Sequence, residues 1–284
     1  MIENSVLREA SSRFCQRVAH LSNGKIVAYR EAQHNIKQTC VIIHGLTGTS
    51  YSMLLLADAY RKHGWRVVVL DLPGHGGSST IPVRNMNDLA DWLHETLQLV
   101  CPNPAIIVGN SFGSSVVLAY IQMYQISLTT RIILSAPIPV FHPILQVIDR
   151  VFACTPDIIA RRIYYTNRLL LGFRTNFLLA RHDQFDYRQI VAECIATEGP
   201  RVRHQYAEMV LMKANLRSNP FSKPLPRYLL SQVVVVYGDT DRLAGKRAMN
   251  YLQKWAAKLR IIEIAQCGHL VHIEGIAEIV KIFN

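Results

Sequence analysis

The stretch IIVGNSFGSS, residues 106–115, places a serine between two glycines where a β-branched run ends. The apolar residues 106–108 predict a buried strand. Gly109 and Gly113 lie two residues on either side of Ser111. This spacing fits a turn so tight that only glycine is tolerated beside a presented side chain. It also fits an ordinary strand-to-helix loop, in which Gly, Asn and Ser are common.

Similar apolar runs recur along the chain and predict its fold class. They occupy residues 39–45, 66–74, 105–111, 131–137, 232–239 and 260–269. Continuous apolar strands are typical of a parallel sheet that is covered on both faces. Helical periodicity lies between them, at 51–63, 86–100, 112–125, 244–258 and 273–283. With an N-terminal antiparallel hairpin at 15–21 and 24–31, we predict an α/β fold with a mostly parallel eight-stranded sheet flanked by helices.

One long interval interrupts this alternation. Between residues 138 and 228 no comparable strand pattern occurs, and seven prolines divide short helical patterns. We therefore predict a helical lid at 138–228, inserted into a core formed by residues 1–137 and 229–284.

Composition narrows the class of protein. The chain has 284 residues, half of them hydrophobic, and a formal charge of +11. No apolar run approaches the ~18 residues of a membrane span, and the first residues lack the apolar core of a secretory signal. The six cysteines are scattered and form no CxxC pair or metal-ligand spacing. We expect a cytoplasmic protein without a structural metal.

Three side-chain types needed for nucleophilic catalysis follow predicted strands. Ser111 follows one strand, the sequence GDTD at 238–241 follows another, and His269 follows the last. Parallel strands present their carboxyl ends at one edge of the sheet, so a nucleophile, an acid and a base would meet there.

These motifs together resemble the α/β-hydrolases, in which serine, acid and histidine occur in this chain order. The resemblance implies that Ser111 is the nucleophile, presented by the strained turn. It implies that His269 is the general base, with His272 as a rival one helical turn further on. For the acid it favours Asp241 over Asp239.

The same resemblance implies an oxyanion hole. One backbone N–H would come from Phe112, directly after the nucleophile, and the other from Leu46 in the loop HGLTG at 44–48. His75 would be structural. No cofactor and no metal would be required.

The chemistry has alternatives on this fold. Haloalkane dehalogenases and epoxide hydrolases carry an aspartate where this chain has Ser111. The carbon–carbon bond hydrolases of aromatic ring degradation often carry a serine motif that resembles GNSFG at 109–113. However, they usually have a glycine-rich stretch where this chain has HGLTGTS at 44–50. A non-catalytic ligand-binding protein with the same fold is a further alternative.

The predicted lid is basic. It holds 11 Arg and 2 Lys against 4 Asp and 3 Glu, a net charge of +6. Arg161, Arg162 and Arg168 lie in a stretch without acids. This positive charge is compatible with a solvated helical face, with a docking surface for an acidic carrier, or with a lid that rests on an anionic membrane. No nucleic-acid-binding motif accompanies it. In character the lid resembles that of the pimeloyl-acyl carrier protein methyl ester esterases. That resemblance implies an ester on an acidic acyl carrier protein, and a place in biotin biosynthesis.

Overall fold

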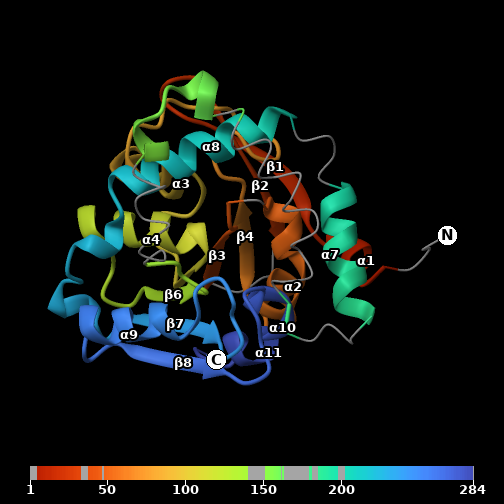
Figure 1. Cartoon of the computed structure of the whole chain (residues 1–284). Coiled ribbons are helices and arrows are strands. Elements are labelled where there is room, and N and C mark those ends of the chain that lie inside the picture. Colours follow the sequence, from red (N-terminus) through yellow and green to blue (C-terminus); the bar gives the residue numbers. More distant parts are fainter. Residues whose placement is uncertain are drawn as a thin grey trace.

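The chain folds around one eight-stranded sheet in a computed structural model (Figure 1). The structure describes residues 5–32, 38–46, 48–139, 151–160, 162, 179–180, 185–197 and 202–283. The strand order is β1-β2-β4-β3-β5-β6-β7-β8. Strands β1 and β2 are antiparallel to each other, β2 is antiparallel to β4, and the other neighbours are parallel. The predicted fold class is confirmed.

The strands lie within the apolar runs that predicted them but are shorter, and the runs at 66–74 and 260–269 continue about four or five residues past the end of the strand. Their bounds are β1 Cys15–His20, β2 Ile26–Ala32, β3 Thr39–Ile43, β4 Arg66–Leu70, β5 Ile106–Asn110, β6 Arg131–Ser135, β7 Val233–Gly238 and β8 Arg260–Ile264. Strands β3 to β7 are almost entirely buried, as expected for strands covered on both faces. The edge strand β1 is mostly exposed, although its alternation predicted one buried face.

The alternating side chains of the central strands pack into two hydrophobic cores, one on each face of the sheet. Val41 and Ile43 of β3 pack in the core that helices α3 (Met86–Val100) and α4 (Phe112–Met123) cover. Cys40 and Ile42 point the other way, into the core beneath α2 (Leu54–Lys62). Because both faces are covered by helices, only the strand ends and their loops are left to form a site.

Further helices flank the sheet or occupy the interval between β6 and β7. They are α1 Val6–Ser12, α7 Phe185–Thr197, α8 Val202–Arg217, α9 Gly245–Trp255, α10 Val271–Glu274 and α11 Ile276–Val280, with short 3-10 turns at Ser50–Met53, Pro220–Ser222 and Arg227–Leu229. The helical patterns predicted α2, α3, α4 and α9 within a few residues. Helix α1 was not predicted, because seven residues give too little periodicity to recognise.

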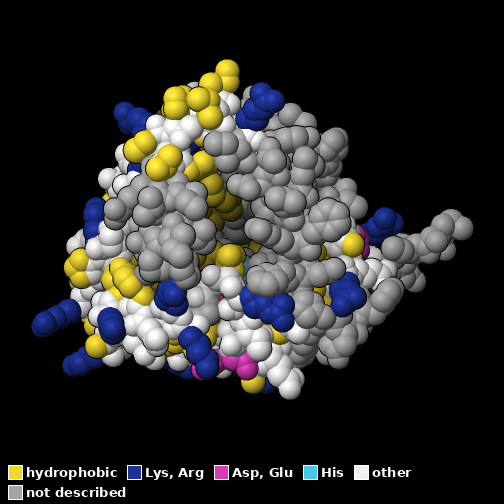
Figure 2. Space-filling model, in the orientation of Figure 1, with side chains coloured by type: hydrophobic (Ala, Val, Ile, Leu, Met, Phe, Trp, Pro, Cys, Tyr) yellow, Lys and Arg dark blue, Asp and Glu magenta, His cyan; other side chains and the backbone are white. Residues whose placement is uncertain are grey.

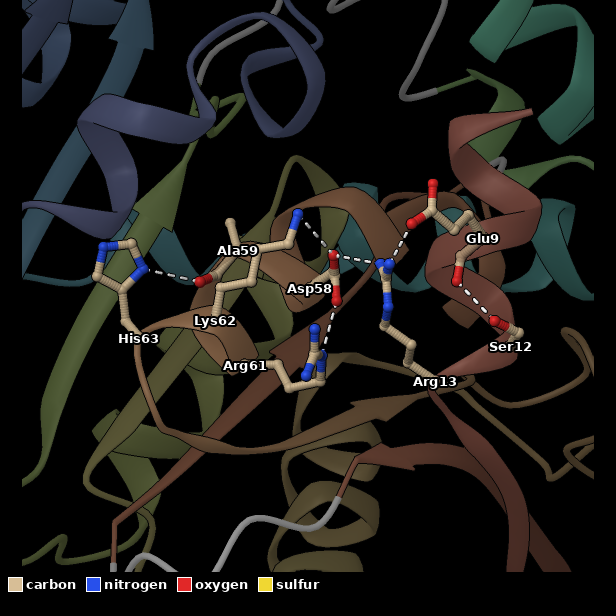
Figure 3. A network of polar contacts seen from close by, with 8 residues as sticks. All are labelled: Glu9, Ser12, Arg13, Asp58, Ala59, Arg61, Lys62 and His63. Carbon is tan, nitrogen blue, oxygen red and sulfur yellow. Dashed lines mark hydrogen bonds and ion pairs between the residues drawn. The ribbon is translucent and has the colours of Figure 1, made fainter. Parts of the chain in front are cut away.

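Helix α1 is attached to the core by a charged cluster around Asp58 (Figure 3). The buried carboxylate of Asp58 pairs with Arg13 at 3.0 Å, with Arg61 at 2.7 Å and with Lys62 at 3.1 Å. Arg13 also pairs with Glu9 of α1. One acid on α2 therefore holds the end of α1 in place.

In the described residues between β6 and β7, helices and 3-10 turns alternate with irregular segments. Helix α8 runs across the molecule above the strands, and α7 lies beside α1 (Figure 1). Both are longer than the short helices that the prolines indicated. The lid bounds of 138 and 228 stay a prediction, since residues 140–150 and 163–178 lie outside the described residues. Among the helices that are described, none is long and apolar enough to cross a membrane.

Candidate active site

Ser111 stands on a strained turn between β5 and α4. Its φ of +51° and ψ of −113° lie in a region that side-chain-bearing residues rarely adopt. The turn needs small neighbours, because a Cβ at Gly109 would lie 2.5 Å from the Gly113 carbonyl oxygen. A Cβ at Gly113 would lie 2.5 Å from the carbonyl oxygen of Ile43. The serine is thus held in a tight turn that presents it, and an ordinary loop is excluded.

The loops that follow β7 and β8 are locked together. The backbone N–H of Thr240 donates to the carbonyl oxygen of Cys267 at 3.1 Å, and the N–H of Cys267 donates to Asp239 Oδ1 at 3.2 Å. Gly238 permits this approach, since a Cβ there would lie 2.0 Å from the Cys267 carbonyl oxygen. These contacts with Cys267 bring the loop of Asp241 next to the loop of His269.

Ser111, His269 and Asp241 form one hydrogen-bonded chain. His269 Nε2 lies 3.0 Å from Ser111 Oγ, and His269 Nδ1 lies 2.8 Å from Asp241 Oδ2. A neutral imidazole satisfies both contacts when Nδ1–H donates to the carboxylate and Nε2 accepts the serine proton. His269 is 4% exposed and Asp241 3%, so the base and the acid are shielded from water, whereas Ser111 is partly exposed.

Asp241 is held ionised in spite of its burial. Burial by itself raises its pKa, but the hydrogen bond and charge of His269 and the N–H groups of Leu243 and Ala244 bring the pKa below its ordinary value. Those two N–H groups donate to Asp241 Oδ1 at 2.8 and 2.9 Å. The carboxylate therefore has a fixed orientation toward His269.

The predicted oxyanion residues belong to two segments that meet at Ser111. Phe112 is the first residue of α4, where backbone N–H groups and the helix dipole favour negative charge. Gly45 lies against the serine, since a Cβ there would be 3.3 Å from Ser111 Cβ. Leu46 follows, and its carbonyl oxygen lies 2.8 Å from His75 Nε2.

Two buried histidines support this loop. His44 Nε2 accepts the N–H of Leu72 at 3.0 Å, so its Nδ1 carries the proton toward the Gly45 carbonyl at 2.6 Å. His75 lies between the carbonyl oxygens of Pro73 and Leu46. These contacts give His75 a structural place, as the sequence indicated, and place it next to the predicted oxyanion loop.

The rival base, His272, is not part of the hydrogen-bonded chain, because Ser111 and Asp241 both contact His269. It lies in α10 and is 6% exposed, and its Nδ1 has no hydrogen-bond partner. Burial, together with the nearby imidazoles of His269 and His44, lowers its pKa to about 3. A histidine that stays neutral and buried beside the base is an uncharged neighbour rather than a proton carrier.

Glu274 is a buried polar residue near the site that the sequence analysis did not single out. It lies five residues after His269 and accepts the backbone N–H of Gly268 at 2.8 Å. The only signal in the sequence is an acid within one α-helical turn and a half of the predicted base, which is too common to be informative.

The arginines predicted to dock a partner are mostly outside the described residues. Arg162 is exposed, whereas Arg161 and Arg168 are not described. Figure 2 shows a hollow below α8 with hydrophobic side chains along it, and, among the described residues on this face, more Lys and Arg than acidic side chains. Within the part of the chain that the structure describes, no group of three His, Cys, Asp or Glu side chains could hold a metal ion.

The chain is similar in sequence to known hydrolases. It is 25% identical over 256 residues to a 2-hydroxymuconate semialdehyde hydrolase of Pseudomonas putida, which covers 86% of this chain and 85% of that protein. It is 30% identical over 95 residues to an (E)-2-((N-methylformamido)methylene)succinate hydrolase of Acinetobacter baylyi. That second match spans 33% of this chain and only 35% of the relative.

Solved structures share the fold along almost the whole chain. The esterase of Exiguobacterium antarcticum superposes with a TM-score of 0.72 at 13% identity, over 95% of this chain and 98% of that one. The family described as the alpha/beta hydrolase fold matches residues 39–276, which include the turn of Ser111 and the loops of Asp241 and His269. The chain belongs to the alpha/beta hydrolase family.

Proposed function

We propose that this protein is a serine hydrolase that cleaves a carboxylic ester through an acyl-enzyme. One observation carries the proposal: Ser111, on a strained turn, is 3.0 Å from His269, which is 2.8 Å from Asp241. A serine hydroxyl becomes a useful nucleophile only when a neighbouring base takes its proton.

Each residue has a step in the reaction. Ser111 Oγ attacks the ester carbonyl while His269 Nε2 accepts the proton, and Asp241 stabilises the imidazolium. The N–H groups of Phe112 and Leu46 hold the negative charge on the carbonyl oxygen. His269 then protonates the leaving alcohol, and a water molecule, activated by the same base, releases the acid and restores Ser111.

Replacement of the nucleophile tests this proposal. Ser111→Ala should lower kcat/KM for a short nitrophenyl ester by several orders of magnitude and abolish labelling by a fluorophosphonate, which phosphonylates activated serines. Ser115→Ala, four residues further on in α4, is the matched control. Ester cleavage at the normal rate by Ser111→Ala would refute the proposal. Tight retention of a ligand without turnover by the wild-type protein would favour the binding-protein alternative.

The finer proposal is that the acyl chain is carried on an acidic acyl carrier protein in the cytoplasm, as a methyl ester. The net charge of +6 on residues 138–228 supports it, because opposite charge steers association with an acidic partner. Charge reversal at Arg161, Arg162 and Arg168 should weaken turnover of the carrier-bound ester and spare a small free ester. Reversal at Lys254, Lys258 and Arg260, which are exposed outside this interval, is the control.

A preference for the carrier should fade as salt is raised, since screening weakens attraction between exposed charges. Equal loss of both activities in the lid variant would argue against docking. An unchanged rate on the carrier-bound ester would do the same.

Carbon–carbon bond hydrolysis is the second candidate function. It is favoured by the similarity to the 2-hydroxymuconate semialdehyde hydrolase over 86% of the chain. The two candidates share Ser111 and His269 but differ in substrate. Consumption of 2-hydroxymuconate semialdehyde, followed by its visible absorbance, with kcat/KM above that for simple esters would select this alternative.

A further inference from the structure

Glu274 connects the turn of the predicted base with the lid. Its Oε2 accepts the backbone N–H of Gly268 at 2.8 Å, and its Oε1 accepts the backbone N–H of Ala180 at 2.9 Å. Gly268 directly precedes His269, whereas Ala180 lies 94 residues away in the interval between β6 and β7. The carboxylate is 6% exposed, so neither donor has bulk water as a substitute.

An apolar contact accompanies these hydrogen bonds. Leu179, which is 1% exposed, packs with Ile273 of α10 and Val191 of α7, and Leu270 packs against the same cluster. Leu270 directly follows His269. The residues on both sides of the base are therefore in contact with the lid, one through Glu274 and the other through packing.

This arrangement makes the position of His269 depend on the lid. The imidazole must stay within hydrogen-bond distance of Ser111, and displacement of catalytic groups by about 1 Å costs on the order of 10² in rate. Packed interfaces of this kind adopt discrete arrangements rather than stretching continuously. A shift of the segment at 179–180 would therefore be transmitted to the backbone of 268–270.

We propose that Glu274 is a positioning residue that couples the seating of the lid segment at 179–180 to the alignment of His269 with Ser111. The proposal rests on the proposed serine-hydrolase function. It assigns the lid a role in the reactivity of the site in addition to any role in substrate choice.

Two substitutions test the coupling from its two ends. Glu274→Gln keeps the shape of the side chain, but the amide oxygen accepts only one of the two N–H groups and the NH₂ group opposes the other. Leu179→Ala removes packing on the lid side and touches no catalytic group. The controls are Glu278→Gln, an exposed acid in α11, and Ile158→Ala, a lid residue that is 83% exposed.

The readouts are kcat and KM for a small free ester and the rate at which a fluorophosphonate labels Ser111. Both test variants should lower kcat and the labelling rate together, by roughly tenfold for Glu274→Gln, because a buried donor loses its acceptor. KM should change by less than about twofold, because substrate binding is not the affected step. Leu179→Met, which conserves volume, should restore the wild-type rates.

Assays below the unfolding temperature of each variant separate misalignment from loss of folded protein. If Leu179→Ala labels at the wild-type rate and changes only KM, the lid contacts substrate but does not align the base, and the coupling is refuted. Slow labelling of Glu274→Gln with normal labelling of Leu179→Ala also refutes the link to the lid. A wild-type protein that is neither labelled nor able to cleave esters would refute the proposed function instead.

Discussion

Asp239 and Asp241 lie two residues apart and accept hydrogen bonds from different partners. Asp241 Oδ2 lies 2.8 Å from His269 Nδ1, whereas Asp239 Oδ1 accepts the backbone N–H of Cys267 at 3.2 Å. One acid orients the imidazole, and the other ties together the loops that carry acid and base. The two roles predict different consequences of mutation.

Asp241→Asn should lower kcat on the order of 10³- to 10⁴-fold with little change in KM, because the amide no longer stabilises the imidazolium and favours the wrong tautomer. Asp239→Asn keeps an oxygen that can accept the Cys267 N–H, so it should retain most of the activity. Steady-state kinetics on one ester compares the pair. A larger loss in Asp239→Asn would reverse the assignment.

Gly113→Ala should destabilise the protein and reduce activity. The new Cβ would lie 2.5 Å from the Ile43 carbonyl oxygen and force α4 away from β3. Overpacking of this kind typically costs about 1–3 kcal/mol. Gly24→Ala is the comparison, because its φ of +75° adds strain but no atom lies within 4 Å of the new Cβ. Denaturant unfolding of both variants should show the larger loss of stability at Gly113.

His75→Leu should lower kcat more than it alters KM. A leucine side chain at position 75 cannot donate a hydrogen bond to the carbonyl oxygen of Leu46. The backbone N–H of Leu46 would therefore lose its orientation toward the charged intermediate. Loss of one oxyanion donor costs on the order of 10²- to 10³-fold, which sets the upper limit. His94→Leu removes a histidine that stacks on Tyr124 between α3 and α4 and serves as the control. Equal kinetics in the two variants would contradict this role for His75.

His272 should make the fold sensitive to mild acid. The folded pKa is lowered to about 3, first by burial and then by His269 and His44, while the unfolded chain binds the proton at about pH 6.5. The stability contribution is therefore complete above about pH 6.5 and is lost as pH falls toward about 3. His272→Phe should flatten the dependence of the urea midpoint on pH in this window, and His20→Gln, at an exposed position, should not. Parallel curves for wild type and His272→Phe would exclude the effect.

Asp58→Asn should loosen the end of α1 and lower the free energy of unfolding by about 1–3 kcal/mol. Burial raises the pKa of Asp58, but hydrogen bonds and charges from Arg61 and Lys62 bring it below its ordinary value. This contribution is therefore present above about pH 4 and is lost as pH falls through the lowered pKa. Glu9→Gln, at an exposed end of the cluster, should change stability by less than about 0.5 kcal/mol. Denaturant unfolding of both variants at neutral and acid pH measures the difference.

Local patterns were enough to predict the sheet, most flanking helices and the presented serine. Period-two and period-3.6 patterns report which faces are buried, and glycines beside Ser111 report a close backbone approach. The order of serine, acid and histidine could also be read along the chain. All of these signals lie within a few residues of the feature that they predict.

Contacts between distant segments decided the rest. The family resemblance favoured Asp241 over Asp239, but local pattern does not separate two acids so close in sequence, and which of them orients His269 depends on how the loops after β7 and β8 meet. The neutral state of His272 arises from burial between segments. The contact of Glu274 with Ala180 joins residues 94 positions apart, and only the folded chain brings that carboxylate within reach of both backbone donors.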